Sequence, residues 1–150
     1  MTRVYCDADV MRYVVSGRML DSDHVRRKLV AYRRYAEAHG FSFYAVAVRE
    51  TGAVIGDVGF GVLQQTGDVE IGWTLAKSAW GRGYATEAAA ATLAAGLEHL
   101  DVARIVAAVD RDNPRSLRVA EKLGMTAFDE LTLKGRPHVL FEIARRTIAR

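Results

Sequence analysis

The sequence lacks several features that mark other classes of protein. It has one cysteine, Cys6, in 150 residues. No disulfide can therefore form within the chain, and we expect a reducing, cytoplasmic setting. No apolar run is long enough to span a membrane, and the first residues show no apolar signal core. The four histidines are scattered without the spacing of metal ligands, so we predict no metal site.

Charge and composition narrow the choice of partners. Lys and Arg number 21 and Asp and Glu number 18, which gives a formal net charge of +3. This charge suits an anionic ligand but is too small to indicate nucleic acid, and we expect neither a nucleic-acid nor a membrane partner. No repeat or linker divides the chain, and it has only two prolines. We therefore predict a single domain over residues 1–150.

The first half of the chain predicts one helix and three strands. Apolar residues recur at helical spacing over residues 22–39, and Gly40 follows as a C-terminal stop. Residues 41–50 and 54–63 are rich in β-branched and aromatic side chains and predict a hairpin. In the second of these strands Val54, Val58, Phe60 and Val62 are expected to share one face. A third strand is predicted over residues 68–75.

The second half predicts two helices and three strands. An alanine-rich helix covers residues 84–99, and residues 104–110 are apolar on both faces, as in a central strand. A second helix over residues 113–124 begins with an Asn-Pro pair and ends at a glycine. Two short strands over residues 126–133 and 138–144 complete the series. This order predicts an α/β (α+β) layered domain with a mixed sheet.

A glycine-rich loop precedes the alanine-rich helix. The stretch WGRGYATEA, residues 80–88, places two glycines and an arginine directly at the start of that helix. The first four N–H groups of a helix have no partner within it, and the helix dipole makes this end positive. Glycine lets the backbone approach a ligand closely. The loop therefore predicts a site for a phosphate or another anion.

Two familiar phosphate sites fit this loop poorly. A P-loop requires a lysine and a Ser or Thr in fixed order, and GRGYATE has no lysine. A dinucleotide site is the second alternative, because Gly81 and Gly83 match two glycines of its motif and Asp110 could hold a ribose. Against it, Thr86 replaces the third glycine, and the preceding strands are connected as hairpins rather than through helices.

Three motifs in order resemble the GNAT superfamily of acetyl-CoA-dependent N-acetyltransferases. WGRGYATEA is similar to the family motif R/Q-x-x-G-x-G/A, with Trp80 in the Arg/Gln position. VEIGWTL resembles the strand that precedes this motif, and NPRSLRVAEKLGM resembles the second cofactor motif. The sequences of these motifs most resemble those of the RimJ/RimL-type branch, which acetylates protein N-termini. The resemblance covers most of the chain.

The resemblance implies a particular fold. It implies a mixed sheet, mostly antiparallel, with a central parallel pair of strands that splay apart and helices on both faces. The first strand of the family is short or missing, because only a few residues precede the position of Asp9. An uncovered sheet edge invites pairing with another strand, so we expect a homodimer.

The resemblance also implies acetyl-CoA as co-substrate. Backbone N–H groups of the loop would wrap its pyrophosphate, and its pantetheine arm would lie between the splayed strands. Arg82 is the preferred phosphate ligand among the cations, whereas Arg115 and Lys122 fit a solvated surface equally well. The implied cofactor-binding residues are Trp73, Thr74, Leu75, Gly81, Arg82, Gly83, Tyr84, Ala85, Thr86, Asn113 and Arg118.

Two residues are candidates for the chemistry. Glu70 is a carboxylate inside an apolar strand, and partial burial would raise its pKa and make it a base. It fits equally well as a solvent-facing residue on the same side as Asp68. Much of the superfamily carries a tyrosine that protonates the departing thiolate, at the position that Ala120 occupies here. Ser116 is therefore expected to support the departing sulfur modestly, or to be a polar residue of the first helical turn.

The expected activity follows from the resemblance. We expect an acyltransferase that moves the acetyl group of acetyl-CoA to a primary amine by direct attack on the thioester. The preferred acceptor is the N-terminal α-amino group of a protein or peptide. Two alternatives stay open, namely a small-molecule amine such as an aminoglycoside or polyamine as the acceptor, and a non-catalytic CoA-binding regulatory module.

Overall fold

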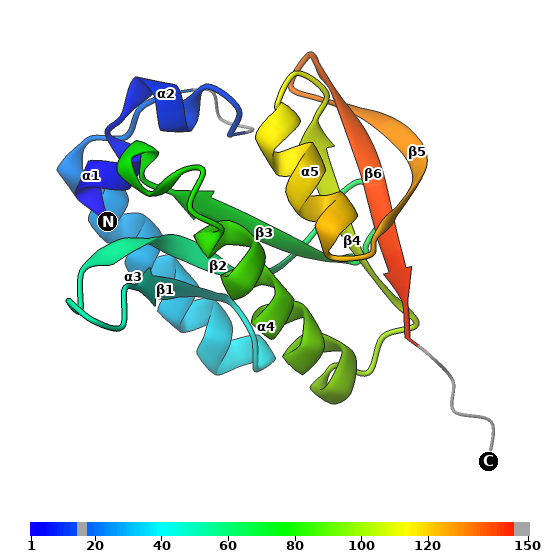
Figure 1. Cartoon of the computed structure of the whole chain (residues 1–150). Coiled ribbons are helices and arrows are strands. Elements are labelled where there is room, and N and C mark those ends of the chain that lie inside the picture. Colours follow the sequence, from blue (N-terminus) through cyan, green and yellow to red (C-terminus); the bar gives the residue numbers. More distant parts are fainter. Residues whose placement is uncertain (15–17, 146–150) are drawn as a thin grey trace.

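The strands described by the computed structural model form one sheet (Figure 1). The structure describes residues 1–14 and 18–145. The strands are β1 (Phe43–Ala47), β2 (Val54–Val62), β3 (Val69–Leu75), β4 (Arg104–Asp110), β5 (Thr126–Leu133) and β6 (Arg136–Ala144). They lie in the order β1-β2-β3-β4-β6-β5, and every neighbouring pair is antiparallel except β3 and β4. The predicted mixed sheet with a central parallel pair is confirmed.

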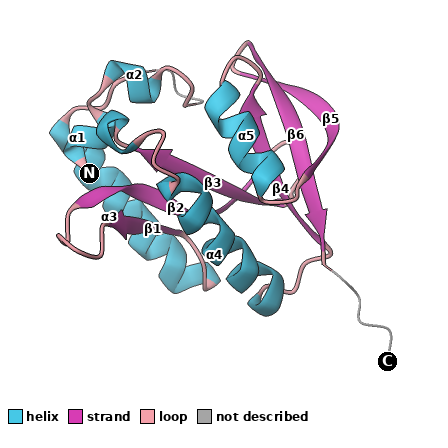
Figure 2. Cartoon of the chain, viewed as in Figure 1, coloured by secondary structure: helices cyan, strands magenta, loops and turns pink. Residues whose placement is uncertain are grey.

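Helices cover both faces of this sheet (Figure 2). The helices are α1 (Thr2–Tyr5), α2 (Ala8–Met11), α3 (Ser22–His39), α4 (Tyr84–His99) and α5 (Pro114–Lys122), with a 3₁₀ turn η1 (Lys77–Ala79). Helices α4 and α5 pack on one face and α3 on the other. Sequence reasoning missed α1, α2 and η1, because elements of three or four residues are too short to show a period. None of the described helices has the length and apolar character needed to cross a membrane.

The main core lies between the sheet and helices α4 and α5. Ile71 and Ile105 of the two central strands pack there with Phe60. Ala89 and Ala120 are fully buried in the two helices, and their small side chains let the helices lie close to the strands. The alanine-rich composition of α4 therefore reflects close packing as well as helix propensity.

Most of the predicted element boundaries are confirmed. Asp21 caps α3, since its carboxylate accepts a hydrogen bond from the N–H of His24 at 2.7 Å. Gly40 ends this helix with a φ of +78°. Asn113 caps α5, and Pro114 occupies its first turn, as the Asn-Pro pair predicts.

One expectation about β2 is wrong. Val58 and Phe60 are buried on the shared face, but Val54 is 48% exposed. The pairing of β2 with β1 shifts by one residue at this point. Val46 pairs with Gly56, but the next residue, Ala47, pairs with Val54. A bulge of one residue moves a side chain to the other face of the sheet, which takes Val54 off the shared face.

A buried carboxylate ties the N-terminal helices to the sheet. Asp57 of β2 is 2% exposed, and its Oδ2 accepts a hydrogen bond from the hydroxyl of Tyr5, which is 1% exposed. The Tyr5 hydroxyl also lies 3.3 Å from the hydroxyl of Tyr32 on α3. Burial raises the pKa of Asp57 to about 6, although the Tyr5 hydrogen bond and the charge of Lys28 act in the opposite direction. The other oxygen of Asp57, Oδ1, is buried without a hydrogen-bond partner in the described part of the chain.

We predict that Gly59→Ala destabilises the protein by about 2 kcal/mol or more, because it overpacks the contact between β1 and β2. A Cβ at Gly59 would lie 2.1 Å from the carbonyl oxygen of Ser42 and 2.4 Å from the Cα of Phe43. Gly61→Ala is the matched control, since its Cβ would find its nearest neighbour, in the Phe43 ring, at 3.6 Å. Guanidinium unfolding of both variants measures the difference. Equal stabilities would contradict the close approach at Gly59.

The pH dependence of stability provides a second prediction. The pKa of Asp57 in the folded protein, about 6, lies above the usual value near 3.9 for an unfolded chain. Its stabilising contribution is therefore complete below the unfolded pKa and is lost as the pH rises through the folded pKa. Between about pH 5 and about pH 7.5, wild type should lose about 1 kcal/mol more unfolding free energy than Asp57→Asn. Parallel stability curves for the two proteins would show that Asp57 titrates normally.

Candidate active site

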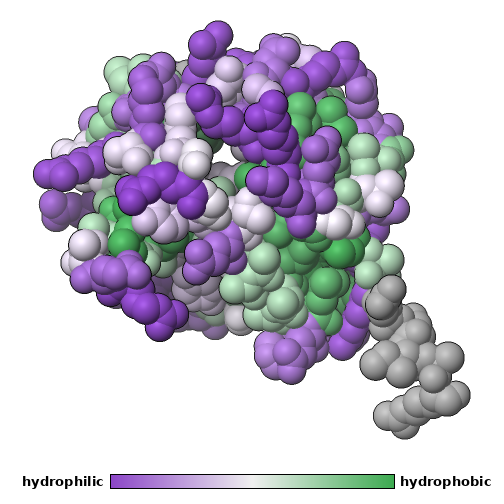
Figure 3. Space-filling view, in the orientation of Figure 1, coloured by the Kyte–Doolittle hydropathy of each residue, from purple (hydrophilic) through white to green (hydrophobic). Residues whose placement is uncertain are grey.

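A cleft of about 520 Å³ opens where β3 and β4 diverge. These strands share a single paired position, Glu70 with Val106, and their later residues are not joined. Residues from both faces of the sheet line the cleft, with Phe43 and Tyr32 on the α3 side and Ser116 on the α5 side. The surface is hollowed between the N-terminal helices and α5, and hydrophilic side chains surround this hollow (Figure 3). The splayed strand pair that the resemblance implies is therefore present.

The backbone of β3 presents polar groups to the gap. The N–H of Ala76 donates to the carbonyl of Ile55 at 2.7 Å, toward β2. Because successive residues of an antiparallel strand alternate in direction, Thr74 also faces β2, whereas Trp73 and Leu75 face the gap. The Leu75 carbonyl accepts a hydrogen bond from the indole of Trp80 at 2.9 Å. Thr74 also lines the cleft.

The glycine-rich loop forms one end of the cleft. Gly81 and Gly83 have φ values of +72° and +81°, a conformation that side chains disfavour. Gly83 is the N-cap of α4 and has no side chain to satisfy the first N–H groups of the helix. The residues of this first turn, Tyr84, Ala85 and Thr86, line the cleft. Their N–H groups and the helix dipole together provide a site for an anion.

Cations from α5 face this loop across the cleft. Arg115, Arg118 and Lys122 line it, and the guanidinium of Arg115 lies 4.8 Å from the centre of the Trp80 ring. Arg82, the cation that the sequence favoured, is not among the lining residues; its guanidinium lies 5.2 Å from the centre of the Tyr84 ring. The sequence favoured Arg82 because of its place in the loop. Which cations of α5 face the loop depends on how that helix packs, and the sequence does not show this.

Ser116 is held as a hydrogen-bond donor. Its Oγ accepts from the indole N–H of Trp73 at 3.3 Å and from the side-chain amide of Asn113 at 3.0 Å. The Asn113 carbonyl in turn accepts the backbone N–H of Ser116 at 3.2 Å. A hydroxyl has two lone pairs and one proton, so these contacts occupy both lone pairs and leave the proton available. Ser116 lines the cleft, and because no described residue accepts its O–H, this group can donate there.

Glu70 lies in the cleft at the point where β3 and β4 separate. Its carboxylate accepts a hydrogen bond from the backbone N–H of Ala108 at 3.2 Å, across the gap. Burial raises its pKa, although this hydrogen bond lowers it. Asp68 has a different environment, because Arg104 binds its carboxylate at 2.9 Å. The two acidic residues of one strand therefore differ, and Glu70 is the one placed to exchange protons with a ligand.

The cleft also contains residues that sequence reasoning missed. Tyr5, Tyr13, Lys28 and Tyr32 line it, with His138 from β6. These residues come from segments far apart in the chain, and no local pattern connects them. Asp57, which binds Tyr5, had a detectable signal, because it is a carboxylate inside an apolar strand, the same criterion that identified Glu70.

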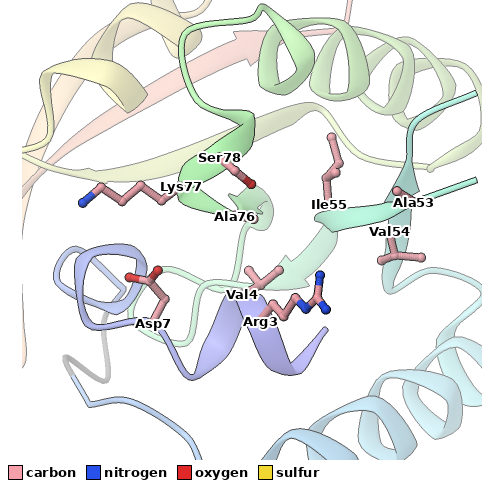
Figure 4. Close-up of a pocket in the computed structure, with 9 residues that line it drawn as sticks. All are labelled: Arg3, Val4, Asp7, Ala53, Val54, Ile55, Ala76, Lys77 and Ser78. Carbon is pink, nitrogen blue, oxygen red and sulfur yellow. The ribbon is translucent and has the colours of Figure 1, made fainter. Parts of the chain in front are cut away.

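A second hollow, of about 560 Å³, lies between α1, the start of β2 and η1. The charged side chains of Arg3, Asp7 and Lys77 point in different directions around it (Figure 4). Lys77 forms its ion pair with Asp9, which is not among the residues that line this hollow. Because these polar groups do not converge on one point, we assign no site there.

Comparison with known proteins identifies the family. The family model described as the acetyltransferase (GNAT) domain matches residues 1–126. The uncharacterised protein YkkB of Bacillus subtilis (strain 168) is 33% identical over 142 residues, which cover 93% of this chain and 81% of that protein. Both matches include β3, the glycine-rich loop and α5.

Solved structures support the same assignment. A GNAT-family acetyltransferase from Bacillus anthracis shares the fold with a TM-score of 0.82 and 24% identity, covering 98% of this chain and 88% of that one. An acetyltransferase from Agrobacterium tumefaciens has a TM-score of 0.73 and 26% identity, covering 91% and 81%. The chain therefore belongs to the GNAT acetyltransferase family and is an acetyl-CoA-dependent N-acetyltransferase.

Proposed function

We propose that this enzyme acetylates the N-terminal α-amino group of a protein or peptide, as the RimJ/RimL-type branch does. The observation that carries the proposal is that Glu70, the donor Ser116 and the anion-binding loop all line one cleft. An α-amino group has a pKa near 8, against about 10.4 for a lysine, so a weak carboxylate base suffices. A ribosomal-protein-S5-alanine acetyltransferase from Vibrio fischeri shares the fold, with a TM-score of 0.71 and 17% identity.

The residues of the cleft support acetyl transfer. Acetyl-CoA, when bound, supplies the activated acetyl thioester. Glu70 removes a proton from the acceptor ammonium, directly or through water, and its raised pKa makes it a better acceptor for that proton. A backbone N–H of β3, with that of Trp73 turned toward the gap, provides a fixed dipole for the oxyanion. The Ser116 hydroxyl donates into the cleft, where it stabilises charge on a departing thiolate.

The same cleft fits the co-substrate. We propose that the first turn of α4, with Gly81 and Gly83, binds the pyrophosphate, because no described side chain caps its N–H groups and glycine permits close approach. Arg115, Arg118 and Lys122 add positive charge on the opposite wall. Trp73 and Leu75 offer backbone groups to the pantetheine arm. Arg82, which lies over Tyr84, is left with a secondary role at the loop.

The fold alone does not choose between acceptors. A spermidine N-acetyltransferase from Vibrio cholerae, solved with CoA and spermine, has a TM-score of 0.76 at 16% identity. An aminoglycoside acetyltransferase solved with coenzyme A also has a TM-score of 0.76, at 19% identity. Small-molecule amines are therefore the alternative acceptors that a test of this proposal includes.

We also propose a domain organisation, an oligomeric state and a cellular location. We propose that residues 1–150 are one acetyltransferase domain, because the described strands belong to one sheet. β1 is an edge strand, and Tyr44 on it is 56% exposed, which supports pairing with a second copy in a homodimer. A cytoplasmic setting fits a chain with one cysteine.

Gly83→Asp is predicted to abolish binding of acetyl-CoA, since it adds negative charge and a side chain at the anion site. In wild type, acetyl-CoA at about a hundredfold excess over its dissociation constant should stabilise the fold by about 2.7 kcal/mol, measured as a thermal shift. Gly67→Asp is the matched control, because Gly67 has a φ of +78° in a turn outside the cleft. A thermal shift with NADH and none with acetyl-CoA would contradict the proposal.

Glu70→Gln is predicted to lower kcat for an N-terminal peptide acceptor by about 100-fold, because it removes the base. Acetyl-CoA should still produce its thermal shift. Asp68→Asn, on the same strand but paired with Arg104, serves as the control and should retain nearly full turnover. Wild-type kcat in Glu70→Gln would exclude Glu70 as the base. Turnover of spermidine or an aminoglycoside without turnover of the peptide would exclude the proposed acceptor.

A further inference from the structure

A cluster on the α3 side of the cleft has no part in the chemistry above. The ammonium of Lys28 lies 4.9 Å from the centre of the Tyr5 ring and 4.8 Å from the centre of the Tyr32 ring. All three residues line the cleft. Asp57 lies behind them and binds the Tyr5 hydroxyl. The cluster is built from α1, α3 and β2, on the sheet face opposite α4 and α5.

This cluster has the properties of a binding site for one cation. The faces of aromatic rings attract positive charge, and two rings attract it from the same place. Asp57 adds a buried carboxylate whose Oδ1 has no hydrogen-bond partner in the described part of the chain. Among the described residues the Lys28 ammonium forms no salt bridge, and its attractive partners are the two rings and the charge of Asp57. A cation of the protein itself therefore fills the site.

We propose that Lys28 determines acceptor specificity by occupying this cation site. The inference rests on the proposed function and deepens it by naming the acceptor class. An acceptor with a second positive charge, such as a diamine or polyamine, would bring that charge beside the Lys28 ammonium or have to displace it from the rings. An acceptor with a single amine avoids this repulsion, and its carbonyl or carboxylate oxygens are attracted to Lys28.

The arrangement therefore disfavours acceptors that carry a positive charge in addition to that of the reacting amine. Glu70 lies in the same cleft and attracts the ammonium that reacts. Lys28 repels a second one. Peptide N-termini followed by neutral or acidic residues satisfy both conditions, whereas spermidine satisfies only the first. The enzyme should accordingly prefer peptides of this kind.

Lys28→Met tests the inference, because it removes the charge and nearly preserves the length of the side chain. The measured quantity is the ratio of kcat/KM for spermidine to kcat/KM for an alanine-terminated peptide amide with neutral side chains. We expect this ratio to rise at least about tenfold over wild type. Lys28→Arg retains the cation and should keep the ratio within about twofold of wild type.

Arg26→Met is the matched control for net charge. Arg26 is exposed on the same helix, and it does not line the cleft. An equal rise in this variant would show that overall charge, rather than the site, sets the ratio. An unchanged ratio in Lys28→Met, or an equal rise in Lys28→Arg, would also overturn the inference.

Two further measurements keep the test decisive. The acetyl-CoA thermal shift of each variant establishes that it is folded, and Lys28→Gln replaces Lys28→Met if the methionine variant does not fold. Calorimetric titration with spermidine should then show tighter binding to the uncharged variant than to wild type. If wild type acetylates the peptide but the ratio does not respond to Lys28, only this inference fails. If wild type prefers spermidine to the peptide, the proposed function fails with it.

Discussion

The divergence of two parallel strands is the constraint on which the rest of this structure depends. β3 and β4 pair at Glu70 and Val106 and then separate, which leaves backbone groups of a central strand without a neighbouring strand. Such groups are costly to bury unless a ligand satisfies them. The protein places a helix N-terminus and the Ser116 hydroxyl around this gap. The cleft is therefore a consequence of incomplete strand pairing, and both β3 and the surrounding helices supply its polar groups.

Local signals made most of the fold predictable. A cap such as Asn113 acts within three residues, so the Asn-Pro pair shows it directly. Runs of β-branched and aromatic residues located every described strand, although β1 is shorter than the predicted run of residues 41–50 and β6 begins two residues before residue 138. The bulge between β1 and β2 was not predictable in this way, because it depends on how two strands pair and not on either strand alone. Helices α1 and α2 were too short to show a period, although α1 supplies Tyr5 to the cleft.

Some residues of the candidate site were likewise predictable from local sequence, and others were not. The glycine-rich loop, Glu70 and Ser116 are each recognisable from neighbours in sequence, and all of them line the cleft. The resemblance implied Arg118 at the cofactor, and Arg118 lines the cleft. The places of Arg115 and Lys122 and the ring pair of Tyr5 and Tyr32 depend on how distant elements pack, so composition and spacing could not fix them. The donor state of Ser116 also needed the structure, because it follows from a contact with Trp73, 43 residues away.

The two sides of the cleft come from different parts of the chain. The side that fits the co-substrate is built from β3, the glycine-rich loop and α5, whereas the α3 side draws mainly on α1, α3 and β1. Under the proposed function, substitutions in the N-terminal third would change which amine is accepted while leaving the glycine-rich loop and α5 unchanged. Such a division lets evolution diversify substrates by varying one segment of a gene under separate selection from the rest.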